Sequence, residues 1–238
     1  MWCHGHKREN THMGDFRIIE VKRSIFEDND ADANRLREEL RAEKTFLLNL
    51  MSSPGAGKTT TLKRTIAALK DELQIGIMEA DIDSDVDAQA ITEAGARAIQ
   101  IHTGGMCHLD ADMTRQGIRE FGTQDMDLVV LENVGNLVCP AEFDTGSTKN
   151  AMILSVPEGD DKPLKYPLMF TICDVVLINK CDTLCVFDDF DKDAVVERIH
   201  RLNPDAEVIF VSAKTGEGFD AWIDWLRREV RTYQSELA

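Results

Sequence analysis

The chain has 238 residues, of which 43 are acidic and 27 are basic, for a formal net charge of −16. Such an acidic chain is unsuited to the phosphate backbone of a nucleic acid, which requires clustered lysine and arginine. The sequence has no run of eighteen apolar residues and no signal-peptide pattern, and its six cysteines are too scattered for a disulfide framework, so we expect a cytoplasmic protein with free thiols.

Strand-like and helix-like patterns alternate along most of the chain. Residues 1–15 show no pattern and predict a flexible tail, and residues 16–45 predict a helical extension because apolar residues recur at helical spacing near its end. We expect strands at 46–51, 75–80, 98–102, 127–132, 151–156, 175–179 and 207–212, and helices at 58–73, 85–95, 110–121, 165–172, 191–201 and 218–235. This alternation predicts one α/β domain at 46–238, with a mostly parallel central sheet flanked by helices on both faces.

A phosphate-binding loop is predicted where the first of these strands meets the helix that follows it. The small residues of the run Ser-Ser-Pro-Gly-Ala-Gly-Lys-Thr-Thr allow backbone N–H groups to curve around a phosphate at the positive end of the helix dipole. Lys58 would contact the β and γ phosphates and Thr59 would hold Mg²⁺, while Ser52 stands where the usual pattern has glycine. The predicted nucleotide-binding residues are Gly55, Ala56, Gly57, Lys58, Thr59 and Thr60. These features predict a P-loop NTPase; the alternative is a glycine-rich turn without a ligand.

Two later motifs favour guanine as the base. Asn179-Lys180-Cys181-Asp182 follows the apolar strand at 175–179, and Asp182 would accept hydrogen bonds from the N1–H and amino groups of guanine. Adenine would leave this carboxylate unpaired, which strongly disfavours ATP. The third element, Ser212-Ala213-Lys214, has the form of the loop that backs guanine in GTPases.

Residues that sense the γ-phosphate are expected at two other strand ends. Asp81 ends the strand at 75–80 and is preferred over the nearby Asp85 and Asp87 as an acid near Mg²⁺. Glu132 occupies the position of a magnesium-binding acid, and the N–H of Gly135 would bond to the γ-phosphate. We therefore expect the catalytic residues to include Lys58, Asp81, Glu132 and Gly135. Because no glutamine or histidine follows Gly135, the sequence predicts slow hydrolysis.

A metal site is a further hypothesis from the sequence. Cys107 and His108 are adjacent, and Cys139 lies four residues after Gly135. Mixed sulfur and nitrogen donors suit Zn²⁺ or Ni²⁺. Three ligands leave the coordination incomplete, so two chains meeting face to face would complete or share it. The alternative is that these are buried structural cysteines.

Several stretches together resemble the HypB family of nickel-incorporation GTPases. They are the phosphate-binding loop, Gly105-Met106-Cys107-His108-Leu109-Asp110-Ala111, Glu132-Asn133-Val134-Gly135-Asn136-Leu137-Val138-Cys139-Pro140-Ala141 and Glu158-Gly159-Asp160-Asp161. The resemblance implies a homodimerising GTPase with GTP and Mg²⁺ as cofactors and nickel at Cys107, His108 and Cys139, where zinc can also bind. It implies delivery of nickel to the large subunit of nickel–iron hydrogenase with a HypA-type partner. From the charge and the lack of a long apolar run, we expect no contact with nucleic acid or membrane.

The N-terminus departs from the family pattern. Many relatives carry a cysteine-rich or histidine-rich nickel motif there, whereas this chain has Cys3, His4 and His6. We hypothesise that closure of Gly135 on the γ-phosphate moves the segment up to Cys139 and so couples nucleotide to metal. The alternatives are a nickel chaperone for another enzyme such as urease, a metal buffer with incidental GTPase activity, and a P-loop kinase.

Overall fold

The structure, a computed structural model, describes residues 16–20, 29–81 and 91–237. Its centre is one sheet of eight strands in the order β1-β4-β3-β5-β2-β6-β7-β8, and all neighbouring strands run parallel. The strands are β1 Phe16–Glu20, β2 Phe46–Ser52, β3 Ile75–Asp81, β4 Arg97–His102, β5 Leu128–Glu132, β6 Lys149–Ser155, β7 Val175–Asn179 and β8 Glu207–Phe210. The predicted α/β class with a mostly parallel sheet is confirmed.

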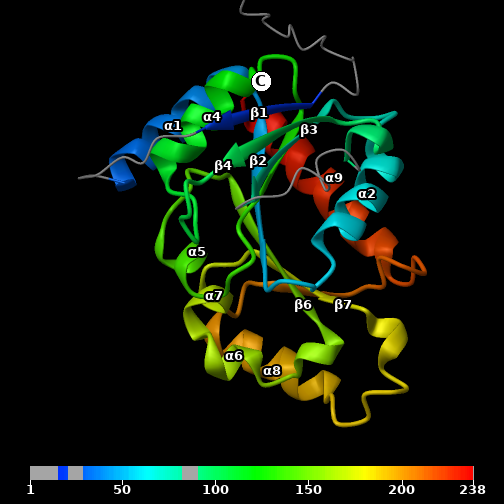
Figure 1. Cartoon of the computed structure of the whole chain (residues 1–238). Coiled ribbons are helices and arrows are strands. Elements are labelled where there is room, and N and C mark those ends of the chain that lie inside the picture. The colour runs from blue at the N-terminus through cyan, green and yellow to red at the C-terminus, as the bar shows by residue number, and fades with distance from the viewer. Residues whose placement is uncertain (1–15, 21–28, 82–90, 238) are drawn as a thin grey trace, which may run out of the picture.

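Helices cover both faces of this sheet (Figure 1). The α-helices are α1 Asn29–Glu43, α2 Lys58–Leu69, α4 Ala111–Phe121, α5 Cys139–Glu142, α6 Lys162–Lys165, α7 Pro167–Thr171, α8 Lys192–Leu202 and α9 Phe219–Glu236. Two short 3₁₀ turns, η1 Val156–Glu158 and η2 Cys181–Thr183, follow β6 and β7. None of the helices within the described ranges is both long and apolar enough to cross a bilayer.

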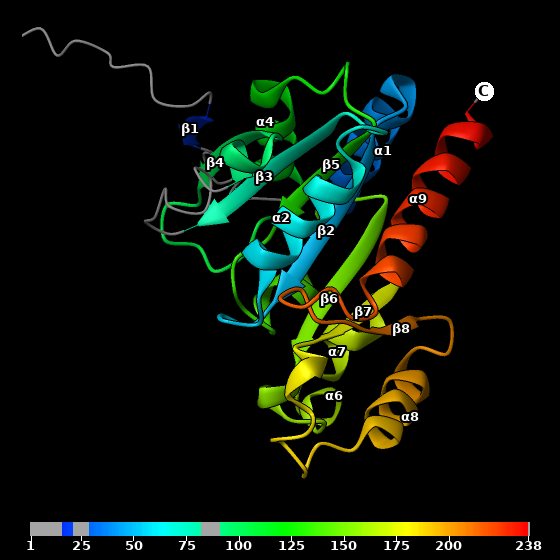
Figure 2. The same ribbon diagram turned by 90° about the vertical axis from the view of Figure 1, so that its right-hand side faces the viewer.

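The central strand β2 shows how its residues build two cores. Phe46, Leu48 and Leu50 pack with α2 and α9, whereas Leu47 packs with α1 and α4. Successive side chains of a strand point to opposite faces, and a strand buried on both faces is apolar throughout, as β2 largely is. Figure 2 shows α2 in front of this strand and α1 behind it.

Several predicted elements need correction. Residues 16–20 belong to the predicted helical extension but form β1, which pairs with β4, and the helix of this region begins at Asn29. The expected helix at 165–172 is divided into α6 and α7 at Tyr166, because proline at the next position disfavours helical backbone before it. The tail at 1–15 and most of the expected helix at 85–95 lie outside the described residues, although 91–94 are helical.

The topology brings the functional motifs to one edge. In a parallel sheet all strands end on the same side, and ligands bind in the crevice beyond those ends. In this sheet β2 leads into the phosphate-binding loop, β5 ends at Glu132, and β7 ends at Asn179.

Candidate functional site

The phosphate-binding loop has the backbone that its glycines predict. Gly55 and Gly57 have φ angles of 77° and 103°, in the left-handed region that glycine adopts without strain. Gly57 is also needed for space, because a Cβ atom there would lie 2.5 Å from Nδ2 of Asn179. No side chain caps the start of α2 at Gly57, where the first N–H groups of a helix lack partners within the helix.

A cavity of about 480 Å³ opens beside this loop. It is lined by the loop itself, by the ends of β3 and β5, and by the chain after β5. Lys58 lies on its wall, with Nζ 3.1 Å from Oγ of Ser52 and 3.9 Å from Oε1 of Glu132. Ser52, which stands where the usual pattern has glycine, therefore contacts the lysine that the sequence predicts to bind phosphate. Thr59 and Thr60, which the sequence predicts to bind nucleotide, also line the cavity.

Glu79 is a cavity residue that the sequence analysis missed. It lies directly opposite Glu132 in the register of β3 and β5, and the two residues are 3% and 4% exposed. The predicted acid on β3, Asp81, is the last residue of that strand, and its role stays a prediction. The only sequence signal for Glu79 is an acid that interrupts an otherwise apolar strand. Thr59, Glu79 and Glu132 all line the cavity, and their oxygens are of the kind that Mg²⁺ prefers.

Residues 133–139 form a linking segment that connects this cavity to Cys139. The linking segment touches the phosphate-binding loop at Gly135, where a Cβ atom would lie 3.3 Å from the backbone nitrogen of Pro54. Its start is held by Asn133, which donates to Oδ1 of Asn49 at 3.1 Å and accepts from the N–H of Val134 at 2.9 Å. Because these groups are buried, they fix the beginning of the segment.

The motifs that the sequence predicts to select guanine contact the phosphate-binding loop through hydrogen bonds. Asn179 donates from Nδ2 to the carbonyl of Ala56 at 2.8 Å and accepts at Oδ1 from the N–H of Ala213 at 3.1 Å. Lys180 donates from Nζ to the carbonyl of Gly55 at 2.8 Å. Asp182 lies half-buried in the η2 turn that follows. The three predicted motifs therefore form one continuous site.

Arg64 of α2 braces the loop of Ser212, Ala213 and Lys214, which the sequence analysis did not foresee. It donates from Nε to the carbonyl of Ala213 at 2.8 Å and from Nη2 to that of Lys214 at 3.0 Å. The loop also closes on itself, since Ser212 Oγ accepts from the N–H of Thr215 at 3.0 Å.

The predicted metal residues come together. Ligand atoms of Cys107, His108 and Cys139 all lie within 4.8 Å of one another. His108 is 6% exposed, and its ring stacks on Phe143 with 3.8 Å between centroids and 10° between planes. The pKa of the Cys107 thiol is raised above its ordinary value, mainly by a hydrogen bond with the Cys139 side chain and to a lesser extent by burial. Two sulfurs and an imidazole nitrogen are donors that suit Ni²⁺ and Zn²⁺.

Most of the chain is similar to known proteins. The family profile described as "CobW/HypB/UreG, nucleotide-binding domain" matches residues 46–210, which is more than half of the chain. The hydrogenase maturation factor HypB of Rhizobium leguminosarum bv. viciae is 45% identical, covering 92% of this chain and 75% of its own. HypB of Escherichia coli K12 is 42% identical, covering 95% of this chain and 79% of its own.

A solved structure is also similar. The structure described as HypB from Helicobacter pylori in complex with nickel superposes with a TM-score of 0.80 at 38% identity, covering 87% of this chain and 96% of the other. The family profile runs from β2 into β8, so the residues that it matches include both the cavity and the cluster of Cys107, His108 and Cys139. The chain belongs to the CobW/HypB/UreG nucleotide-binding family and, within it, to the hydrogenase maturation factor HypB group.

Proposed function

We propose that this protein is a GTP-hydrolysing metallochaperone. It binds nickel in the cytoplasm and delivers it, through GTP-dependent dimerisation, to the large subunit of nickel–iron hydrogenase together with a HypA-type partner. One observation carries the proposal: the linking segment touches the phosphate-binding loop at Gly135 and ends at the metal-ligand candidate Cys139.

The nucleotide half of the proposal assigns roles to residues of the cavity. Lys58 neutralises charge on the β and γ phosphates, and the N–H groups at the start of α2 bind their oxygens. Mg²⁺, when bound, would neutralise charge between these phosphates, with Thr59 as ligand and Glu132 holding its waters. Asp182 selects guanine, while Asn179 keeps the base-binding strand end in contact with the phosphate-binding loop at Ala56.

The metal half follows from the donor set. Nickel is the cargo of this site, and a cargo must be held and then released. Cys107, His108 and Cys139 supply three donors from one chain, so a second chain across a dimer interface would complete or share the coordination. Zn²⁺ fits the same donors. When GTP binds, Gly135 would close on its γ-phosphate. This movement would change the position of Cys139 and with it the affinity for nickel.

Metal content and oligomeric mass, measured together, test the proposal. With a non-hydrolysable GTP analogue and nickel, we expect a dimer with stoichiometric metal, and with GDP a larger share of monomer. Cys107→Ala should abolish stoichiometric metal binding and leave GTP binding intact. Loss of both in this variant would assign Cys107 a structural role, and a monomer under all conditions would refute the dimer mechanism.

A further inference from the structure

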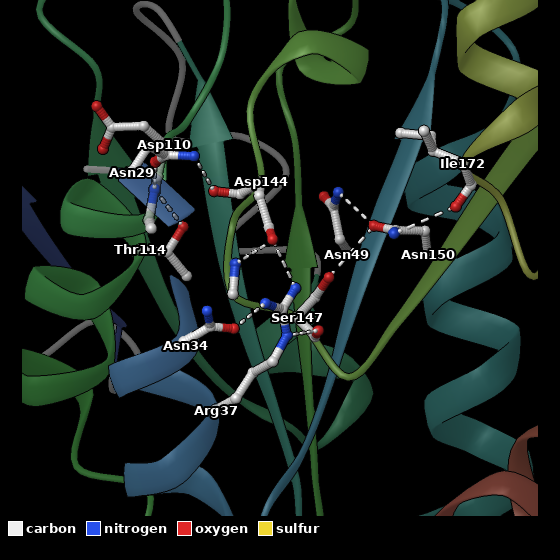
Figure 3. Close-up of polar contacts among 12 residues, drawn as sticks. Asn29, Asn34, Arg37, Asn49, Asp110, Thr114, Asp144, Ser147, Asn150 and Ile172 are labelled. Carbon is white, nitrogen blue, oxygen red and sulfur yellow. Dashed lines mark hydrogen bonds and ion pairs between the residues drawn. The ribbon is translucent and has the colours of Figure 1, made fainter. Parts of the chain in front are cut away.

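The first residue of α1 contacts both of the segments that carry the metal-ligand candidates. Asn29 donates from Nδ2 to the carbonyl of Asp144 at 3.0 Å and accepts at Oδ1 from the N–H of Ala111 at 2.9 Å. Ala111 begins α4 three residues after His108, and Asp144 lies five residues after Cys139. A single amide side chain therefore joins two stretches that are far apart in the sequence, and Figure 3 shows it beside Asp144.

Asp144 is also held from further along the same helix. Arg37 donates from Nη2 to both carboxylate oxygens of Asp144, at 2.6 and 2.8 Å, and from Nε to the carbonyl of Ser147 at 3.1 Å (Figure 3). Charge-assisted bonds of this kind are short and specific in geometry. Both side chains are about one-third exposed, at 32% and 35%. The chain after α5 is thus anchored to α1 at two points, Asn29 and Arg37.

The other partner of Asn29, the N–H of Ala111, lies at the start of α4, which is itself held in place. Asp110 caps α4 by accepting from the N–H of Met113 at 2.8 Å, and its carbonyl accepts from the hydroxyl of Thr114 at 2.7 Å. Further along the two helices, Arg115 of α4 pairs with Glu39 of α1 at 2.7 Å. Because His108 lies two residues before Asp110, these contacts of α4 with α1 also restrain the position of His108 relative to α1.

The link passes close to the metal cluster itself. Phe143, whose ring stacks on His108, is the residue immediately before Asp144. The carbonyl that accepts from Asn29 thus belongs to the chain that also places Phe143 against the imidazole. Moving Asp144 away from α1 would change the stacking on His108 and the distance between His108 and Cys139 together.

We propose that Asn29 is a positioning residue of the metal site, which holds the His108 loop and the Cys139 helix at the spacing that one ion requires. The inference rests on the proposed function, because it assumes nickel at the three-donor cluster. Side chains that orient metal ligands typically change metal affinity by about 10–100-fold when they are removed. Asn29 acts through two backbone groups rather than on a ligand directly, so we expect the lower end, about tenfold.

Two variants at this position separate the contacts. Asn29→Leu keeps a side chain of similar size and removes both hydrogen bonds. Asn29→Asp keeps an acceptor for the N–H of Ala111 but places a carboxylate against the carbonyl of Asp144. Glu38→Leu is the control, since it also replaces a polar side chain by leucine at an exposed position of the same helix, away from the contacts to Asp144 and Ala111.

The readouts are the nickel Kd by competition with a chelator, the sulfur-to-nickel charge-transfer absorption, the Tm of the metal-free protein and the affinity for GDP. The Cys107→Ala variant defines which part of the nickel signal belongs to the cluster rather than to the N-terminal tail. We expect both Asn29 variants to raise the nickel Kd about tenfold and to shift the absorption band, with GDP affinity unchanged and Glu38→Leu like the wild type.

Three results would overturn the inference. One is a nickel Kd and band in Asn29→Asp that match the wild type, even if Asn29→Leu fails to fold. Another is an equal loss of nickel and GDP affinity, which would mean general destabilisation. The third is equal nickel binding by the wild type and Cys107→Ala, which would remove the metal site and the proposed function with it. In the first two cases the metal site itself would stand.

Discussion

The contact between Gly57 and Asn179 allows a quantitative test of how the phosphate-binding loop is built. A Cβ atom on Gly57 would lie 2.5 Å from Nδ2 of Asn179, and the φ angle of 103° is unfavourable for alanine. Gly57→Ala should therefore destabilise the protein by about 1–2 kcal/mol from the backbone and about 2 kcal/mol more from overpacking. Asn179→Ala should cost about 2 kcal/mol, because it removes two buried hydrogen bonds of about 1 kcal/mol each.

The double variant distinguishes the two costs of Gly57→Ala. Once Asn179 is alanine, the clash is gone and only the backbone strain and the lost hydrogen bonds remain. We expect the double variant to be more stable by about 2 kcal/mol than the sum of the single effects, which is the removed overpacking term.

Urea unfolding followed by tryptophan fluorescence measures these free energies. Trp222 is buried in α9 and donates to the hydroxyl of Thr65 on α2 at 2.9 Å, so its emission reports the packing of the helix that follows the loop. Additivity of the two substitutions within about 0.5 kcal/mol would refute the predicted contact.

Three further predictions concern base selection, the second acid and the α1–α4 contact. Asp182→Asn should sharply lower the preference for GTP over ATP in competition binding, because an amide nitrogen would face the donors of guanine; an unchanged preference would contradict the base assignment. Glu79→Gln should reduce the Mg²⁺ dependence of GTP hydrolysis while leaving metal-free GDP binding intact, since Glu79 lines the same cavity as Glu132; hydrolysis with an unaltered Mg²⁺ titration would exclude that role. The hydrogen bond and charge of Arg115 lower the pKa of Glu39 below the ordinary value of about 4.3. The ion pair therefore stabilises the fold by about 0.5 kcal/mol after solvent screening. This stabilisation is fully present when the pH is above the unfolded-state pKa of Glu39, and it is lost as the pH falls through the lower folded-state pKa. The difference in unfolding free energy between wild type and Arg115→Met should therefore shrink in acid.

The parts of the site that could be predicted are those encoded locally. The loop ending in Lys58 follows the apolar strand β2, and Asn179 ends the apolar strand β7. The parallel topology alone therefore brings them to the same edge of the sheet. The clustering of Cys107 and His108 with Cys139 was an expectation from donor chemistry and resemblance, and the distances agree with it.

The parts that were missed depend on contacts between distant residues. The strand β1 was assigned to a helical region because its pairing with β4 joins residues about eighty positions apart. Glu79 is absent from the sequence analysis because a lone acid in an apolar strand does not reveal how far the cavity reaches along that strand, while the role of Asp81 stays a prediction. The link from Asn29 to Asp144 spans 115 positions and uses a backbone carbonyl, which no side-chain motif can reveal.

The central claim is that nucleotide and metal binding share the linking segment, and one titration tests it most directly. The nickel Kd of the wild-type protein is measured with GDP and with a non-hydrolysable GTP analogue, under the same Mg²⁺ concentration, with Cys107→Ala as the blank. The account predicts different Kd values in the two nucleotide states, because Gly135 contacts the phosphate-binding loop and Cys139 ends the same segment. Equal Kd values would contradict it.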